Sequence, residues 1–175
     1  QVIHESTRFP TLNGVSQAPV VRTDGSFAIT DGYDAETKMY LSLGESMGEL
    51  RNLVPKHPSD EQIQAARELI VDELLVDFPF ENESALAYAV ALLITPLVRP
   101  LLPTSMFFLL TAIQPGMGKG VLANTVSSVV FGSSVQFQSL PSSNDEMRKM
   151  LTSLVTSGAT FRAFDEVAEL KSSVL

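Results

Sequence analysis

The spacing of apolar residues changes twice along the chain and divides it into three parts. Residues 1–57 carry short apolar runs between turn-forming residues, which is typical of small β-sheets. Residues 58–104 repeat apolar positions at helical spacing, and residues 105–175 alternate continuous apolar runs with helical patterns. We therefore expect an α/β fold with a small N-terminal β-hairpin region, a helical section, and an incomplete parallel sheet with flanking helices.

Turn residues locate the strands of the first part. Residues 20–29 predict a β-hairpin, with Asp24 and Gly25 at the two positive-φ positions of a tight turn. Gly32–Asp34 predicts a further turn, and Met39–Leu41 predicts a third short strand. A sheet this small buries little apolar surface by itself, so we expect it to pack on the parts that follow.

Two helices are predicted in the helical section. Ser59 and Gln62 have the form of a capping box, and apolar residues then recur on one face of a helix until near Asp77. A second helix over residues 83–97 is apolar nearly all round, as expected for a helix buried on most of its surface. Pro96 should kink or end this second helix, because it lacks the N–H that a helix interior needs.

The last part predicts the order strand, loop, helix, strand, helix, strand. Residues 106–113 form a continuous apolar run, which is typical of a parallel strand covered on both faces. A Gly-rich loop leads from it into a helix predicted over residues 119–131, and a short strand is predicted at 135–137. A further capping box opens the next helix at Ser143, and residues 160–164 predict a second core strand.

Composition narrows the class of protein. The chain has 175 residues, of which 45% are hydrophobic and 18% charged, and this composition excludes intrinsic disorder. Cysteine is absent, which excludes disulfides, cysteine-ligated zinc and a cysteine nucleophile. A formal net charge of −8 argues against binding nucleic acid over the whole surface. Prolines and an arginine interrupt the apolar stretch 85–113, so we expect no membrane span and a cytoplasmic protein.

The Gly-rich loop carries the sharpest chemical signal. Glycines let a loop backbone wrap a phosphate, the following helix N-terminus attracts negative charge, and a lysine reaches the terminal phosphates. The motif G-x-x-x-x-G-K-[ST] is matched imperfectly, because Ile113 stands at the first glycine and Gly120 at the Ser or Thr that binds magnesium. The residues that we assign to the bound nucleotide are Pro115, Gly116, Met117, Gly118, Lys119, Gly120 and Val121. The alternative is a tight structural turn with a solvated lysine.

An acidic pair ends the last predicted strand, with Asp165 lying 46 residues after Lys119. Nucleotide hydrolases hold magnesium with an Asp at the end of a core strand, and an adjacent Glu polarises the attacking water. We therefore assign Asp165 to the metal and place Glu166 and Lys119 in catalysis. Alone, the pair is typical of an acidic helix start, but together with the loop it favours a nucleotide site.

Several short motifs follow one another in a characteristic order. They are Arg8-Phe9-Pro10, the stretch 18–26, Gly32-Tyr33-Asp34, Asp77-Phe78-Pro79-Phe80, the stretch 95–100, the loop 115–120, the stretch 145–149 and Asp165-Glu166. Their order resembles helicase/primase-type replication proteins that bacteriophages and integrative elements encode. The similarity covers the chain from about Arg8 to Val167 and depends more on the shared order than on any one motif.

This resemblance implies a P-loop ATPase related to AAA+ or superfamily 3 helicases, which works on DNA as a homo-oligomeric ring. It implies ATP and Mg²⁺ as ligands, with Gly116, Gly118 and Lys119 at the phosphates, Asp165 at the metal and Glu166 at the water. Full-length relatives add a sensor residue and an arginine finger, whereas this chain begins without Met and stops nine residues after Glu166. We expect a fragment of a longer protein that binds ATP but hydrolyses it weakly or not at all.

A non-enzymatic function is the alternative. In this hypothesis the loop is structural, and the hairpin and helical parts recruit a replication partner such as a primase or another subunit. An ion pair between Lys119 and a carboxylate of the protein would favour this alternative. A phosphate bound at the N-terminus of the following helix would count against it.

Overall fold

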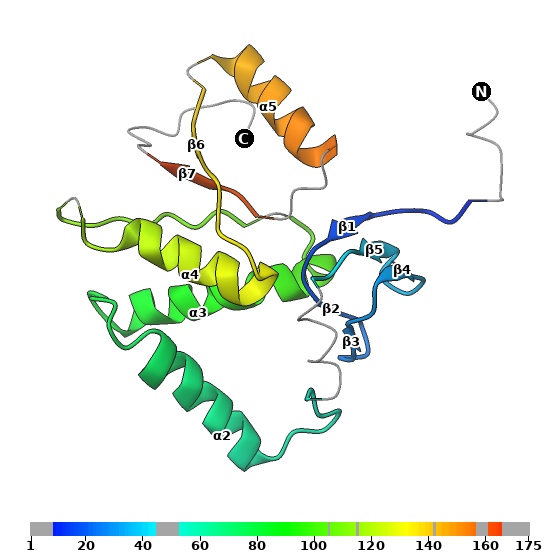
Figure 1. The fold of residues 1–175 in the computed structure, drawn as a ribbon, viewed down its shortest axis with the longest axis horizontal. Helices are drawn as coiled ribbons and strands as arrows, with labels where there is room; N and C mark the ends of the chain where they lie inside the picture. The colour runs from blue at the N-terminus through cyan, green and yellow to red at the C-terminus, as the bar shows by residue number, and fades with distance from the viewer. Residues whose placement is uncertain are drawn as a thin grey trace.

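The computed structural model describes residues 9–44, 53–104, 106–114, 116–141, 143–156 and 161–165. Two residues of the predicted site, Pro115 and Glu166, lie outside these ranges. The described chain is a mixed α/β structure of small sheets and helices, which confirms the predicted class at this coarse level (Figure 1). Helices α3 (Glu83–Val98) and α4 (Lys119–Phe131) pack against each other, while α2 (Asp60–Glu68) projects away from them (Figure 1).

Short strands near the N-terminus form a three-stranded sheet and a hairpin. They are β1 (Gly14–Ser16), β2 (Val20–Val21), β3 (Phe27–Ala28), β4 (Gly32–Asp34) and β5 (Met39–Leu41). In the sheet, the central β5 pairs in parallel with β1 and antiparallel with β4, while β2 and β3 form the hairpin. The predicted hairpin and the predicted strand at 39–41 are confirmed. The predicted turn at 32–34 is wrong, because its backbone pairs with β5 as a strand.

The hairpin turn differs from the prediction at one residue. Gly25 has a φ of +82°, but Asp24 does not have a positive φ. The Gly25 N–H donates to the Arg22 carbonyl at 3.0 Å, and the Asp24 carboxylate accepts from the Ser26 N–H at 2.8 Å. Asp24 therefore stabilises the turn through its side chain, and only Gly25 needs the left-handed backbone.

A carboxylate at the end of β4 ties the sheet to the hairpin. Asp34 Oδ1 accepts from Arg22 Nε at 3.0 Å and from Arg22 Nη2 at 2.6 Å. Asp34 Oδ2 accepts from the Thr37 N–H at 3.0 Å and from the Thr37 hydroxyl at 2.8 Å. The hydrogen bonds from Arg22, helped by those from Thr37 and opposed by burial, lower the pKa of Asp34 from 3.8 to about 2.

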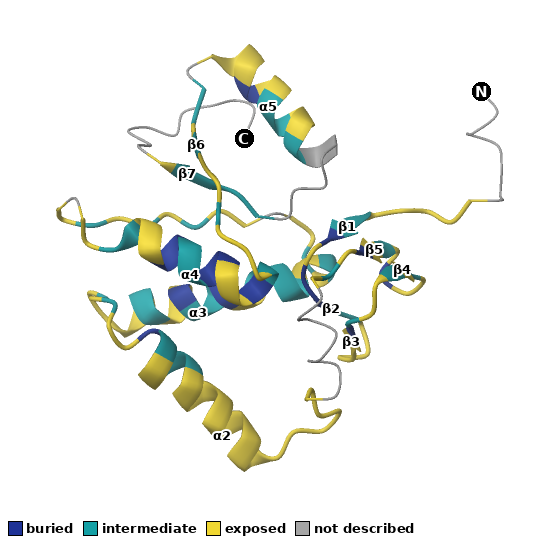
Figure 2. Cartoon of the chain, viewed as in Figure 1, coloured by how far each residue is buried: buried dark blue, intermediate teal, exposed yellow. Residues whose placement is uncertain are grey.

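The first predicted helix is confirmed at its start, and its apolar face is exposed along α2. Ser59 and Gln62 form the capping box, with Ser59 Oγ accepting at 3.3 Å and Gln62 Oε1 accepting at 3.0 Å. Helix α2 then continues as a π-helix, η1 (Leu69–Leu74). Figure 2 shows α2 exposed along its length, and Ile63 on it is 54% exposed. Contact with the main core begins at Ile70 in η1. The apolar stripe is present, but the described chain places no element against it.

Helix α3 lies against the main core on one side. Its buried residues are Ala89, Leu92 and Leu93, so the predicted burial on most of its surface is wrong. Asn82 caps it by accepting from the Ala85 N–H at 3.0 Å. The helix continues past Pro96, where a kink or an end was predicted, and ends at Val98. A 3₁₀ turn, η2 (Arg99–Leu101), follows it. The core contains buried residues from α3 and α4, one residue just before β2 and one just after η1. They are Ala18, Leu75, Ala89, Leu92, Leu93, Leu122, Val126 and Val130.

The helical stretch from Glu83 to Leu101 also has the length and apolar composition of a membrane span, and it is the one such stretch in the described chain. These two properties are weak evidence for a span, because a helix in the core of a water-soluble domain shares them. The absence of a membrane span therefore stays a prediction.

The predicted strand at 106–113 does not belong to any sheet of the described residues. Phe108 and Leu110 pack against the core, whereas Phe107 and Leu109 are 64% and 80% exposed. Successive side chains of the segment alternate between the core and solvent, as in an extended chain with one covered face. The prediction was wrong because a strand buried on both faces needs a hydrogen-bonded neighbour and a second covering layer, and the described chain supplies neither.

The elements around α4 follow the predicted order. Helix α4 covers the range predicted for it, whereas β6 (Phe137–Ser139) starts two residues later than expected. Strand β7 (Ala163–Asp165) pairs in parallel with β6, with Ser139 opposite Asp165. Between these strands lies α5 (Asn144–Thr156), where Ser143 Oγ accepts from the Glu146 N–H at 3.2 Å. A parallel pair with an intervening helix is thus present, and Asp165 ends one of its strands.

Candidate functional site

Two glycines of the predicted loop adopt a backbone conformation that other residues rarely take. Gly116 has a φ of +83° and Gly118 a φ of +85°. A Cβ built on Gly116 would meet no atom within 4 Å, so its glycine is required by the backbone and not by lack of space. These two glycines turn the chain from the extended segment at 106–114 into α4.

Helix α4 begins at Lys119 without a side-chain cap. Gly118 is its N-cap residue, and its first turn carries no acidic side chain. The Leu122 N–H donates to the Gly118 carbonyl at 2.8 Å and closes the first turn. The three preceding N–H groups, those of residues 119–121, have no acceptor within the helix and lie at the positive end of its dipole. This arrangement can accept the oxygens of a phosphate.

Lys119 is half-buried at the start of this helix. Within the part of the chain that the structure describes, it forms no ion pair with a carboxylate. Its ammonium group can therefore neutralise an anion that lies at the helix N-terminus. The ion pair expected for a purely structural loop is not seen among these residues.

Gly120 leaves room for a side chain. A Cβ built there would lie 3.6 Å from Phe137 Cζ, which is an ordinary van der Waals distance. Its φ is not positive, so a serine or threonine would fit the backbone. Glycine at this position removes the hydroxyl that the motif offers to magnesium, while the local space would accept one.

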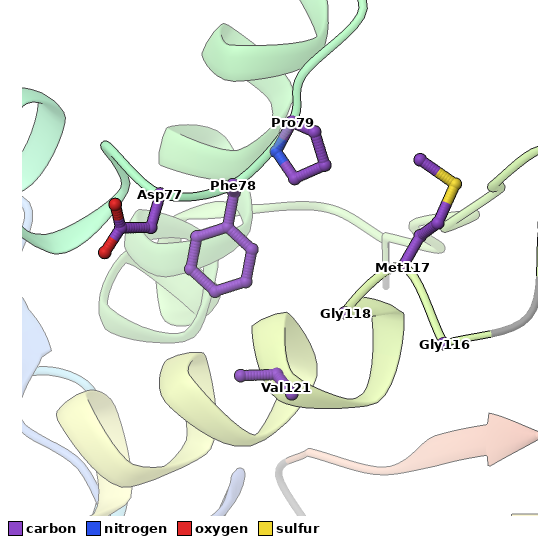
Figure 3. Close-up of a pocket in the computed structure, with 7 residues that line it drawn as sticks. All are labelled: Asp77, Phe78, Pro79, Gly116, Met117, Gly118 and Val121. Carbon is purple, nitrogen blue, oxygen red and sulfur yellow. The ribbon is translucent and has the colours of Figure 1, made fainter.

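Asp165 is exposed at the carboxyl end of β7. The chain ahead of the loop and β7 run in the same direction across Figure 1, and in Figure 3 the β7 arrow ends on the side of Gly116. The loop and the carboxyl end of β7 thus lie toward the same side of the molecule, although only β7 belongs to a sheet of the described residues. In the described ranges, no three His, Asp or Glu side chains gather as a metal site. A single Asp with phosphate and water ligands would be enough for a nucleotide-bound magnesium ion.

A cavity of about 360 Å³ opens beside the loop (Figure 3). One wall comes from the connection between η1 and α3, and the other comes from the loop and the first turn of α4. The residues that line it are Asp77, Phe78, Pro79, Gly116, Met117, Gly118 and Val121. A Cβ built on Gly118 would lie 3.9 Å from Phe78 Cε1, so the aromatic ring reaches the loop itself.

Sequence reasoning missed this contact of Phe78 with the loop. Phe78 does pack against the main core, and its ring centroid lies 6.1 Å from that of Phe80. The segment reaches the loop from 38 residues earlier in the chain, counting from Phe78 to Gly116. Only its position within a shared order of motifs pointed to it, since no local pattern links residues so far apart.

No family model, curated protein or solved structure matches this chain.

Proposed function

We propose that this chain is the ATP-binding portion of a DNA-replication ATPase of a mobile element, built on an incomplete P-loop sheet. The observation that carries the proposal is the N-terminus of α4, where two left-handed glycines precede a helix that begins at Lys119 with no capping side chain. Loop residues 115–121 hold the phosphates, and Asp165 holds Mg²⁺ at the carboxyl end of β7. ATP is thus anchored by backbone N–H groups and one lysine.

In this proposal, different residues bind the phosphates and the metal ion of the nucleotide. The N–H groups of residues 119–121 and the Lys119 ammonium neutralise phosphate oxygens. Asp165 contributes a hard oxygen ligand, which Mg²⁺ prefers, and water fills the position that Gly120 leaves open. Glu166 orients the attacking water in the full-length protein, which works on DNA as a homo-oligomeric ring.

A non-enzymatic interaction module is the second candidate. Exposed apolar side chains along 106–113 favour it, with Leu109 80% and Ile113 94% exposed. In such a module, the polar groups of the loop would be paired with other groups of the protein. Lys119 has no carboxylate partner among the described residues, and this favours an external anion.

Titration with fluorescently labelled ATP in the presence of Mg²⁺ tests the proposal. Lys119→Ala should abolish binding, because it removes the cation that faces the phosphates. Lys149→Ala, which removes an exposed lysine from α5, is the matched control and should bind like the wild type. The proposal fails if the wild type does not bind at millimolar nucleotide, or if the two variants lose affinity equally.

A further inference from the structure

The cavity beside the loop is walled by apolar groups that solvent can reach. Val121 is 62% exposed and Met117 is 38% exposed, although both lie next to a helix N-terminus suited to anions. Phe78 and Pro79 form the opposite wall (Figure 3). Apolar side chains beside an anion site suit a ligand that has a charged part and a flat apolar part.

The orientation of the side chains shows which groups face the cavity. In Figure 3 the Phe78 ring extends toward the turn that holds Gly118 and Val121, while the Asp77 carboxylate points away from the loop. The Met117 side chain rises from the loop toward the level of Pro79. The space is therefore bounded by a ring, a thioether and aliphatic groups, and its one carboxylate faces elsewhere.

We propose that this cavity is the base subsite of the nucleotide site and selects a purine by stacking and apolar contact. The inference rests on the proposed function, since the loop must hold the phosphates for the base to reach the cavity. Phe78 supplies an aromatic surface, and Met117 and Val121 cover the opposite side. A volume of about 360 Å³ lies near the lower end of the range of ligand pockets, about 300 Å³.

The lining also determines what the subsite cannot distinguish. Strong discrimination between similar ligands requires buried polar groups that one ligand satisfies and the other leaves unpaired. No lining side chain directs such a group at the base, because the Asp77 carboxylate points away. Adenine and guanine should therefore bind with similar affinity, whereas pyrimidines, with a smaller stacking face, should bind less tightly.

Isothermal titration calorimetry on the 175-residue chain tests this inference with ATP, GTP, CTP, UTP and inorganic tripolyphosphate, all with Mg²⁺. Tripolyphosphate reports the phosphate site alone, because it has no base. The wild type should bind ATP and GTP about tenfold more tightly than tripolyphosphate, as expected for one stacked base, and CTP and UTP at intermediate affinity.

Two variants remove the subsite and keep the phosphate site. Phe78→Leu keeps an apolar side chain in the core but removes the aromatic face, and Pro79→Ala shortens the same wall without touching the core cluster. Both should bind all four nucleotides at about the tripolyphosphate affinity, with tripolyphosphate binding unchanged. Tyr88→Leu removes an exposed aromatic ring outside the cavity and should behave like the wild type.

The outcomes separate the two proposals. If the wild type binds tripolyphosphate but ATP no more tightly, or if both cavity variants keep the preference for purines, the base subsite is wrong and the phosphate site stands. Equal losses for tripolyphosphate and ATP in Phe78→Leu also overturn it, because they indicate a structural role. If the wild type binds neither ligand, the proposed function itself fails.

Discussion

Asp34→Asn should destabilise the chain by removing one negative charge from a nearly buried cluster. The Asp34 side chain is 11% exposed, and its two oxygens accept four hydrogen bonds from Arg22 and Thr37. An asparagine side chain has one oxygen and one NH₂ group, so donors that face the NH₂ lose their acceptor. The substitution therefore breaks the tie between β4 and the hairpin, and β2 of that hairpin packs against α3.

The size of the effect follows from the pKa of the carboxyl group. Its pKa falls from 3.8 to about 2 in the folded chain, which corresponds to about 2 kcal/mol of stability at pH 7. Because the folded pKa lies below the unfolded pKa, this contribution is complete above pH 3.8 and disappears as the pH falls through about 2. Wild type and Asp34→Asn should thus differ at neutral pH and converge in acid.

Urea denaturation followed by circular dichroism at pH 7, 5, 4, 3 and 2 measures this difference. Asp72→Asn removes an exposed carboxylate from η1 and controls for the general loss of charge, with an expected change within about 0.5 kcal/mol. The reasoning is refuted if Asp34→Asn is as stable as the control at pH 7. It is also refuted if the deficit of Asp34→Asn is the same at pH 7 and at pH 2.

Two further predictions concern the metal. Gly120→Ser should tighten ATP binding about fivefold with Mg²⁺ but not with EDTA, because one hydroxyl ligand is worth about 1 kcal/mol, whereas Gly120→Ala adds the same Cβ without a ligand. Calorimetry checks both variants, and equal affinities would show that no metal lies near this position. Asp165→Asn should lower ATP affinity only when Mg²⁺ is present. An equal loss in EDTA would mean that Asp165 acts on the fold.

Local signals in the sequence were sufficient for the elements whose cause is local. The Ser59 capping box and the helix over Lys119–Phe131 were predicted at their observed starts, because caps and glycines act within a few residues. The hairpin was predicted too, although Asp24 acts through its side chain and not through its backbone angle. In each case the residues that define the element also form its hydrogen bonds.

Elements that depend on distant partners were predicted poorly. The apolar run at 106–113 has the composition of a core strand, but a strand is defined by neighbours, and no described segment pairs with it. Gly32–Asp34 has turn-forming residues, yet its pairing with β5 makes it a strand. The apolar face of α2 is also correct as a pattern, while Ile63 on it is 54% exposed. Periodicity identifies a face without showing what covers it.

The candidate site likewise has one part that was predicted from local sequence and one part that depends on distant contacts. The loop and its lysine were predicted from adjacent residues, and the positive φ angles of Gly116 and Gly118 follow from the need to turn into α4. The contact of Phe78 with Gly118 was not predicted, because tertiary packing brings the two together. The proposed phosphate site is thus local in sequence, whereas the proposed base subsite is created by the fold.

The net charge of −8 and the proposed site for a polyanion are compatible because electrostatic effects in water act over short distances. At physiological salt, charges more than about 8 Å apart on the surface are largely screened. An anion at the start of α4 would therefore interact mainly with the helix N-terminus, with Lys119 and with a bound Mg²⁺. The first turn of α4 contains no acidic residue that would repel it. The overall charge instead slows the approach of any free polyanion, including the proposed ligand ATP, since long-range steering depends on the summed field. Binding of the magnesium complex, which carries less negative charge than ATP alone, should suffer least from this repulsion.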